Sequence, residues 1–241
     1  MADELAPESL SPVTRNISAV LVHIQQAAQR AGRQPDAIRL VAATKFVPLH
    51  RVQEAIEAGV RILGESRLQE ALPKMHALRS APELAWHFIG RLQRRKVKSV
   101  VGVFEMIHSV DSLTLAEEIN RRAGESGVSQ AVLLEVNIGG ESTKAGFMPS
   151  DVADVLTALD GMPNLTVKGL MVIPPQTAQA EQARPYFRRT RGLAEELGRL
   201  ELKQASMGEL SMGMSQDYHV AVEEGATLVR VGTAIFGERP E

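Results

Sequence analysis

The residue best suited to covalent chemistry is Lys45, which closes the apolar run 38–45. This run reads Ile-Arg-Leu-Val-Ala-Ala-Thr-Lys and has the composition of a buried β-strand. A lysine at the end of a barrel strand can form a Schiff base with an aldehyde or a ketone. The structural alternative is a lysine that is solvated or paired with a carboxylate, as lysines at strand ends most often are. Both interpretations stay open on the residue type alone.

A second segment with chemical potential lies near the other end of the chain, at residues 227–237. There a strand-like apolar run that contains Arg230 leads directly into Gly232 and Thr233. Such a turn can offer backbone N–H groups to an anion such as a phosphate. An amine for an aldehyde, a phosphate cradle and an arginine between them describe a site for pyridoxal 5'-phosphate (PLP). These residues are far apart in the sequence, so a fold must bring them together.

The composition is that of an ordinary globular domain and excludes several kinds of chemistry. The chain has 241 residues, 44% of them apolar and 23% charged, which suits one α/β barrel. With 27 basic and 29 acidic residues the net charge is -2, so no global field draws the protein to nucleic acid or anionic lipid. The absence of cysteine excludes disulfides and thiol nucleophiles. The six histidines show no metal-ligand spacing, and we expect no metal.

The sequence gives no sign of export or of membrane insertion. Its first eight residues are acidic and lack the basic-then-apolar pattern of a signal peptide. No apolar stretch approaches the roughly 18 residues that a membrane-spanning helix needs. We therefore expect a cytoplasmic protein, monomeric, with neither a membrane nor a nucleic acid as partner.

Short apolar runs alternate with amphipathic segments along the chain. Apolar residues at helical spacing predict a first helix over 9–31, ended by Gly32. The predicted strands are 38–43, 60–64, 85–89, 104–109, 131–137, 166–173, 209–212 and 227–231. The predicted helices between them are 49–58, 67–78, 92–101, 112–123, 149–159, 177–197 and 216–224. Eight strands predict a closed parallel (β/α)8 barrel of the TIM type, in which the extra N-terminal helix takes the place of the missing eighth helix.

The competing architecture is an open, doubly wound sheet. That fold normally carries a Gly-rich turn after its first strand, whereas this chain reads Thr-Lys-Phe-Val-Pro at 44–48. We therefore favour the barrel. Because no linker, repeat or low-complexity segment divides the sequence, we expect a single domain over 1–241.

In such a barrel the carboxyl ends of the strands share one face, which holds the active site. Strand eight closes beside strand one, so Lys45 should lie next to Arg230 and the turn that follows it. Structural alternatives exist here too. His87 stands between two aromatic residues, as a hydrogen-bonded core histidine would, and Arg230 could pair with Glu65. The basic segment 91–98 is expected to form a solvated face, with a phosphate or another anionic partner as the alternative.

Six motifs, in order along the chain, resemble those of the pyridoxal phosphate homeostasis protein family. They are Ala-Ala-Thr-Lys at 42–45, Gly-Glu-Ser-Arg-Leu-Gln-Glu at 64–70, Trp-His-Phe-Ile-Gly-Arg-Leu-Gln at 86–93, Gly-Leu-Met at 169–171, Leu-Ser-Met-Gly-Met-Ser at 210–215 and Val-Arg-Val-Gly-Thr-Ala-Ile-Phe-Gly at 229–237. The last two motifs are specific to that family. The resemblance implies a single barrel of the alanine racemase type, which is PLP fold type III.

The resemblance also implies roles for individual residues. PLP would be held as a Schiff base on Lys45, with Arg230 facing the pyridine nitrogen. The residues implied to hold the phosphate are Ser211, Gly232 and Thr233, and those implied to line the pocket are Ser66, His87, Met171, Gly213 and Ser215. Two departures stand out. The family usually has Asn at the position of Ser66, and it usually reads Gly-Pro-Leu-Gln-Ser-Asn-Lys where this chain has Gly-Arg-Leu-Gln-Arg-Arg-Lys at 90–96, which makes the rim more basic.

The chemistry of this site favours binding over turnover. A guanidinium can only donate, so Arg230 would leave the pyridine nitrogen neutral and the cofactor a poor electron sink. Racemisation needs an acid or base on each face of the substrate, and Lys45 could serve only one. The resembling racemases take the other from a tyrosine of a second domain, which this chain lacks. Its two tyrosines, Tyr186 and Tyr218, fall within predicted helices.

We therefore expect a PLP carrier or regulator without catalytic activity, which could hand the cofactor to apo forms of PLP-dependent enzymes. The first alternative is an amino-acid racemase of the alanine racemase type. The second is a class I aldolase that uses Lys45 on a phosphorylated sugar, although the end of strand one offers no acidic neighbours for it. A purely structural barrel would leave the combination of Lys45, Arg230 and the Gly-Thr turn unexplained.

Overall fold

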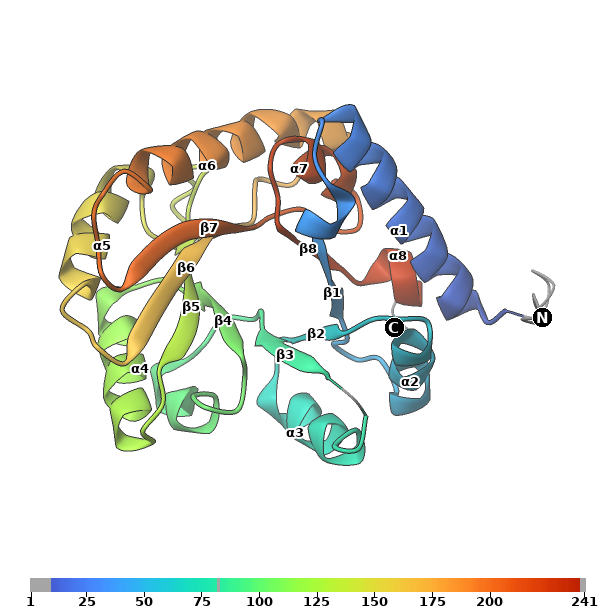
Figure 1. Ribbon diagram of the computed structural model, residues 1–241, viewed down its shortest axis with the longest axis horizontal. Helices are drawn as coiled ribbons and strands as arrows, with labels where there is room; N and C mark the ends of the chain where they lie inside the picture. Colours follow the sequence, from blue (N-terminus) through green and yellow to red (C-terminus); the bar gives the residue numbers. More distant parts are fainter. Residues whose placement is uncertain (1–9, 82, 239–241) are drawn as a thin grey trace.

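The computed structural model of the chain is a closed barrel of eight parallel strands wrapped by helices (Figure 1). The structure describes residues 10–81 and 83–238. The strands are β1 (Arg39–Ala43), β2 (Ile62–Glu65), β3 (Ala85–Phe88), β4 (Met106–Val110), β5 (Gln130–Val136), β6 (Leu165–Val172), β7 (Ala205–Ser211) and β8 (Leu228–Val231). Each pairs in parallel with the next, and β8 pairs with β1, so the predicted TIM-type barrel is confirmed.

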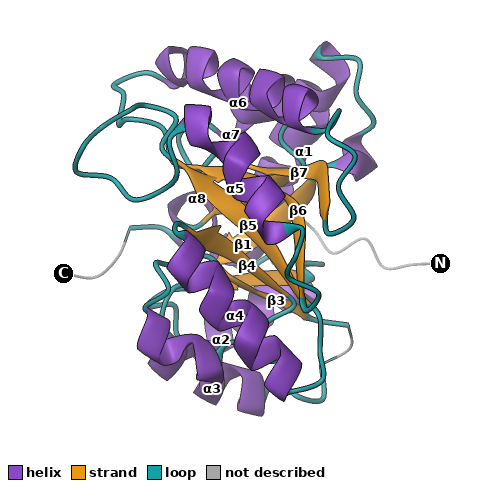
Figure 2. Ribbon diagram, turned by 90° about the vertical axis from the view of Figure 1, so that its left-hand side faces the viewer, coloured by secondary structure: helices purple, strands orange, loops and turns teal. Residues whose placement is uncertain are grey.

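The helices lie on the outside of the barrel, as the side view in Figure 2 shows. They are α1 (Pro12–Arg30), α2 (Leu49–Glu57), α3 (Leu68–Ala77), α4 (Leu113–Glu125), α5 (Val152–Leu159), α6 (Arg184–Leu197), α7 (Tyr218–Glu223) and α8 (Thr233–Phe236). Parallel strands that are covered on their outer face and packed inside need apolar residues on both faces, which explains the nearly continuous apolar runs of the sequence.

The first helix, α1, is well specified by its sequence. The Ser11 side chain caps it by accepting a hydrogen bond from the Thr14 amide, and Pro12 occupies its first turn. Its buried stripe packs against α2, α7 and α8, so that it covers the outside of the barrel where β8 meets β1 (Figure 1). The predicted substitution of α1 for a missing eighth helix is thus confirmed, although a four-residue helix, α8, also follows β8.

The segment predicted as a helix over 92–101 is instead a short 3-10 helix, η3 (Arg94–Ser99). Lys98 follows Arg94 by four residues and Arg95 by three, and like charges at these spacings disfavour an α-helix. Its buried residue Val97 and the buried Val100 and Val101 that follow are β-branched, and such residues lose side-chain freedom in a helix. The stretch before α6 is likewise a separate 3-10 turn, η5 (Ala180–Ala183), rather than the start of one long helix.

Two sets of buried residues fill the molecule. The larger set lies between the barrel and its helices, and the smaller apolar set, inside the barrel, consists of Val41, Met106, Leu133, Met171 and Leu228. Polar residues are buried as well, among them His87, His108, Ser211 and Arg230. The interior of this barrel is therefore only partly apolar.

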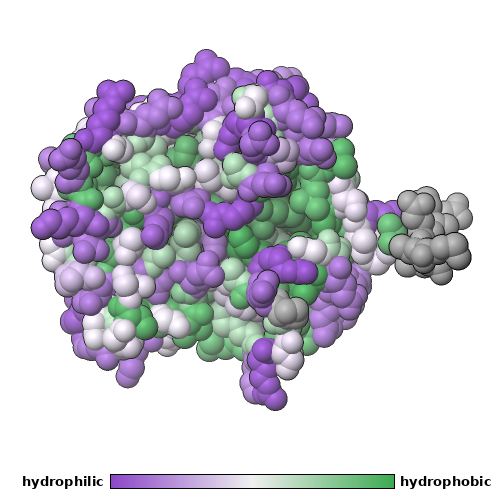
Figure 3. All heavy atoms as spheres, viewed as in Figure 1, coloured by the Kyte–Doolittle hydropathy of each residue, from purple (hydrophilic) through white to green (hydrophobic). Residues whose placement is uncertain are grey.

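Figure 3 shows polar and charged residues spread over one face of the molecule, with apolar residues exposed between them rather than in one broad field. No helix in the described ranges combines the length and the apolar character needed to cross a bilayer. Within those same ranges, no three His, Asp or Glu side chains are placed to bind a metal ion.

Candidate cofactor site

Closure of the barrel brings the two chemically suggestive segments together. In the pairing of β1 with β8, Val41 lies opposite Arg230 and Ala42 opposite Val231. A Cβ atom placed on Gly232 would lie 3.4 Å from the Cβ atom and from the carbonyl oxygen of Ala43. Lys45 follows Ala43 by two residues, so it begins the turn directly beside the end of β8. The strand that leads to the lysine and the strand that carries the arginine and leads to the Gly-Thr turn are therefore neighbours.

Lys45 lies in a turn whose next residue, Phe46, has a positive φ of 63°. The Lys45 Nζ atom is 4.9 Å from the centre of the Phe46 ring, and within the described ranges it forms no ion pair. Two carboxylates near this turn bind other groups: Lys74 donates to Glu65 Oε1 at 2.6 Å, and the Phe46 amide donates to Glu70 Oε2 at 2.7 Å. The interpretation of Lys45 as a salt-bridged lysine is therefore wrong.

A buried network under this turn holds it in place. The Thr44 hydroxyl donates to Glu65 Oε1 at 2.7 Å, and Lys74 Nζ donates to the Thr44 carbonyl at 2.5 Å. Glu65 is fully buried, but Arg230 donates to Ser211 and to the Val172 carbonyl instead, so the suggested pairing of Glu65 with Arg230 is wrong. Since Lys74 and Glu65 neutralise each other below the turn, the Lys74 amine is not free to compete with that of Lys45.

Beside Lys45, backbone N–H groups converge on one hydroxyl. Ser215 Oγ accepts hydrogen bonds from the amides of Gly232 and Ala234, both at 3.2 Å. Thr233 lies between these amides, at the exposed start of α8. Gly232 has a φ of -120°, which any residue can adopt, so glycine is not needed here for an unusual conformation. What it contributes is the absence of a side chain, which leaves its backbone N–H accessible. We call Ser215 and the residues 232–234 the cradle.

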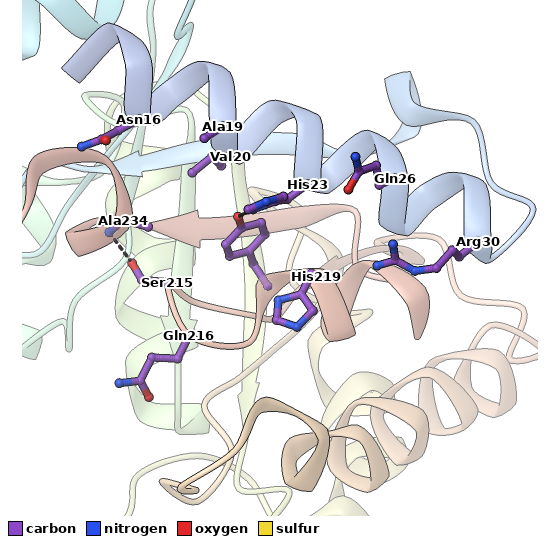
Figure 4. A pocket seen from close by; sticks show the side chains of 11 residues that line it. Asn16, Ala19, Val20, His23, Gln26, Arg30, Ser215, Gln216, His219 and Ala234 are labelled. Carbon is purple, nitrogen blue, oxygen red and sulfur yellow. Dashed lines mark hydrogen bonds between the residues drawn. The ribbon is translucent and has the colours of Figure 1, made fainter. Parts of the chain in front are cut away.

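The outer side of the cradle opens onto a cavity of about 470 Å³ between α1 and α7 (Figure 4). His23, Gln26, Gln216 and His219 line it together with Ser215 and Ala234, and the bond between the last two is drawn in the figure. Lys45 and Arg230 do not line it. The cradle is thus reached from outside the barrel as well as from its top.

Arg230 is buried to 6% exposure and held by three hydrogen bonds. Nη1 donates to the carbonyl and to the hydroxyl of Ser211, at 2.8 and 2.6 Å, and Nη2 donates to the Val172 carbonyl at 3.0 Å. Burial lowers the pKa of Arg230 to about 10, which Asp217 and Glu135 partly oppose, so the side chain stays a cation at neutral pH. In the described part of the chain, Nε–H and the second Nη2–H have no acceptor. The edge that carries Nε–H is therefore free to donate.

Ser211 lies below the cradle, not on it. Its side chain is fully buried, with Oγ 2.6 Å from Arg230 Nη1 and 2.9 Å from His108 Nδ1. Its role as a phosphate ligand stays a prediction, but the hydroxyl that contacts the Gly232 amide belongs to Ser215. The sequence offered two serines after β7, and only their contacts distinguish them.

Three other predicted pocket residues occupy different places. Met171, 1% exposed, is part of the apolar set inside the barrel and forms a floor below the strand ends. Gly213 has a φ of +90°, and a Cβ there would lie 2.5 Å from the Ala221 Cβ atom, so its missing side chain accommodates α7. Ser66 is half-buried after β2, where its backbone touches Gly90.

His87 is a core residue, and it has a partner that the sequence did not reveal. Its Nδ1 lies 2.9 Å from Nε2 of His108, and both rings are fully buried. Burial, and to a smaller extent Arg39, lowers the pKa of His87 to about 4. The pKa of His108 falls well below its usual value, first through burial and then through His87, Arg230 and Arg39. The sequence feature that could have indicated His108 is its position as a polar residue in the middle of an apolar strand.

Stability is therefore expected to fall with acidification through the range in which free histidine titrates. Because the folded pKa of His87 is depressed, the unfolded chain binds more protons between about pH 4 and 6.5. The contribution of neutral His87 to the free energy of unfolding is fully present above pH 6.5 and is lost as the pH falls toward 4. We expect the free energy of unfolding to drop by about 2 kcal/mol from His87 alone between pH 7.5 and pH 5.

Urea unfolding followed by circular dichroism at pH 7.5, 6 and 5 measures this drop. His87→Gln should reduce it by about 2 kcal/mol, and substitution of the exposed His50 by Gln should leave it unchanged. Comparing variants cancels the contributions of carboxylates such as Glu135 and Asp217, whose pKa values burial raises. Equal pH dependence in all three proteins would contradict the prediction.

Comparison with known proteins agrees with this fold. Residues 16–240 match the family model of the alanine racemase N-terminal domain. The chain is 47% identical over 223 residues to the pyridoxal phosphate homeostasis protein of Aquifex aeolicus, covering 92% of this chain and 96% of that one. It is 40% identical over 230 residues to that of Pseudomonas aeruginosa, covering 95% and 97%.

A solved structure is similar as well. PipY of Synechococcus elongatus, with PLP bound, superimposes with a TM-score of 0.80 at 37% identity, covering 93% of this chain and 100% of that one. Identity at this level over nearly the full length of both chains defines a shared family. The chain carries the domain found at the N-terminus of alanine racemases and belongs to the pyridoxal phosphate homeostasis protein family.

Proposed function

We propose that this protein binds PLP through a Schiff base on Lys45, holds it and passes it to other proteins, without turning over amino acids itself. The observation that supports this most is the meeting of three groups at the junction of β1 and β8. They are the unpaired amine of Lys45, the free edge of Arg230 and the cradle. The names of the relatives and the PLP found in PipY support the same assignment.

The residues present suit each part of the cofactor. The amides of residues 232–234 and the hydroxyls of Ser215 and Thr233 can donate to a phosphate. Two of these amides now donate to Ser215 Oγ, so an anion's oxygen would bind them by replacing the serine oxygen there. The Nε–H edge of Arg230 can donate to a ring nitrogen, and the Lys45 amine can condense with an aldehyde. When bound, the cofactor supplies an electrophilic aldehyde and a ring that can withdraw electrons.

The surroundings of the site support a role without catalysis. Arg230 remains a cation that only donates, so a ring nitrogen facing it would keep its lone pair engaged and unprotonated. Tyr218 is 4% exposed, its hydroxyl lies 2.9 Å from His23 Nδ1, and burial raises its pKa. It is therefore not available as the second acid that a racemase needs.

The test combines transfer with turnover. The PLP-loaded protein is first incubated with each common amino acid in deuterated water, and exchange at Cα and change of chirality are followed. It is then mixed with the apo form of a PLP-dependent enzyme, whose recovered activity reports transfer. We expect recovery without racemisation, because a single positioned base leaves at most weak exchange.

Free PLP at the concentration that the loaded protein releases unaided is the control for transfer. Racemisation of any one amino acid at the 1–10³ s⁻¹ typical of enzymes would assign the protein to the racemases instead. If free PLP and the loaded protein restored the same enzyme activity, PLP binding by this protein would still hold, but its role in transferring the cofactor would be refuted.

A further inference from the structure

A line of polar side chains crosses the interior of the barrel from one mouth to the other. It begins at Arg230 on β8, passes Ser211 on β7 and His108 on β4, and ends at His87 on β3. The successive contacts are 2.6 Å from Arg230 Nη1 to Ser211 Oγ, 2.9 Å from there to His108 Nδ1, and 2.9 Å from His108 Nε2 to His87 Nδ1. All four residues are buried.

The far end of this line lies at the amino ends of the strands. His87 Nε2 is buried and has no hydrogen-bond partner among the described residues. The Glu105 carboxylate, which precedes β4 and has a side chain 61% exposed, lies 3.9 Å from it. Arg39, at the start of β1, is the neighbouring cation and is paired with Glu209.

The arginine fixes the direction of every bond in this line. A guanidinium has no acceptor, so Arg230 must donate to Ser211 Oγ. The single hydrogen of that hydroxyl then goes to His108 Nδ1. A neutral His108 must carry its proton on Nε2 and donate it to His87 Nδ1, which in turn leaves the proton of a neutral His87 on Nε2. Each bond thus points away from Arg230.

Hydrogen bonds that run in the opposite direction along this line leave more buried polar groups without a partner. If His108 Nδ1 carried the proton, Ser211 Oγ would accept from two donors and its own hydrogen would be buried without an acceptor. His87 Nε2 would also become an acceptor without a donor. The forward direction leaves only the Nε2–H of His87, and it directs that hydrogen toward the Glu105 carboxylate.

We propose that His108, supported by its hydrogen bond to His87, is a positioning residue for Arg230. By accepting the hydroxyl hydrogen of Ser211, His108 keeps a lone pair of the Ser211 oxygen directed at the guanidinium. Arg230 is thereby oriented so that its free Nε edge faces the carboxyl ends of the strands. This inference rests on the proposed function, because the orientation of Arg230 matters for binding only if the ring nitrogen of the cofactor lies at its Nε edge. Neutral rings suit the role, since a charged ring would repel the buried guanidinium, and burial lowers the pKa of both histidines.

The direction of the line is measured first, on the full chain without cofactor. Nitrogen-15 NMR of the histidine rings at pH 7.5 distinguishes a protonated Nδ1 from a protonated Nε2. We expect His87 and His108 both to be neutral and protonated on Nε2. In Ser211→Ala the two directions leave equal numbers of unsatisfied groups, so a second tautomer of His108 should appear. Protonation of His108 on Nδ1 in the unsubstituted protein, or an unchanged tautomer in Ser211→Ala, would overturn the proposal.

Positioning is then measured as PLP affinity in a matched pair of variants. His108→Leu removes the acceptor and should weaken binding about tenfold, whereas His108→Asn places an amide oxygen near the position of Nδ1 and should restore most of the affinity. Equal affinities in the two variants would overturn the positioning role. Ser211→Ala serves as the second variant if His108→Leu does not fold, and a tenfold loss is expected there as well.

Failure of the proposed function would look different. A protein that binds no PLP would refute the cofactor assignment. If its histidines were protonated on Nε2 and the tautomer of His108 responded to Ser211→Ala, the proposed direction of the hydrogen bonds would still hold. The control is His76→Gln, which changes an exposed histidine of α3 and should change neither readout.

Discussion

Replacing Lys45 by alanine is expected to abolish the visible absorption of the PLP-loaded protein and to leave nothing on the chain for borohydride to reduce. The amine is the reactive group in this assignment, and the buried lysine nearest to it, Lys74, is held by Glu65 and the Thr44 carbonyl. Lys74 therefore offers no substitute. Absorbance before and after reduction, followed by mass spectrometry of a digest, measures the loss and locates the adduct.

The matched control is Lys98→Ala, which removes an exposed lysine of the basic segment 91–98 and should retain the full absorption band. In the unsubstituted protein the adduct should lie on the peptide that contains Lys45. An adduct on another lysine, or a Lys45→Ala protein with an undiminished band, would show that the Schiff-base assignment is wrong.

Gly169→Ala is expected to be the most destabilising of the single substitutions considered, by about 3–5 kcal/mol in the free energy of unfolding. Gly169 lies opposite Glu209, where the pairing of β6 with β7 shifts register. A Cβ atom there would lie 1.9 Å from the carbonyl oxygen of Glu209 and 2.9 Å from its nitrogen. These are backbone atoms that no side-chain rotation can move, so the two strands would have to separate.

Gly208→Ala is the matched control on the adjacent strand. Gly208 is exposed, and a Cβ atom there would meet nothing within 4 Å. Its effect should stay within about 0.5 kcal/mol, the range of ordinary surface substitutions. Urea unfolding of the two variants beside the unsubstituted protein compares them directly. Similar losses in both would mean that the close approach of β6 and β7 relaxes easily.

Most of the strands could be predicted because they are apolar runs of strand length that alternate with amphipathic segments. β7 begins at Ala205, four residues before the predicted strand 209–212, because most of its first residues are small or polar and none of them is fully buried. The errors lie where local sequence and tertiary packing disagree. Residues 92–101 have apolar spacing that suits a helix, but their basic residues and valines yield only η3. The four residues of α8 read as a turn, because they are too few to show a period.

The site divides in the same way. The proximity of Lys45 to Arg230 and Gly232 could be predicted, since it follows from closing an eight-stranded barrel. The separate places of Ser211 and Ser215 could not, because both follow apolar residues at the end of one strand. His108 was missed because its partner Ser211 is 103 residues away, and only the closed barrel shows that the two side chains point inward together.

The position of α1 has a consequence for how the protein is made. Its Asn16 side chain donates to the carbonyl of Ile235, 219 residues away, and His23 contacts Tyr218, 195 residues away. A ribosome delivers the chain from its amino end at about 5–20 residues per second, so α1 waits for nearly the whole of synthesis before its partners exist. The junction it covers is also the one that brings Lys45 to the cradle. A nascent chain thus carries Lys45 early but acquires the cradle only in its last stretch, so the proposed capture of the cofactor requires the barrel to have closed.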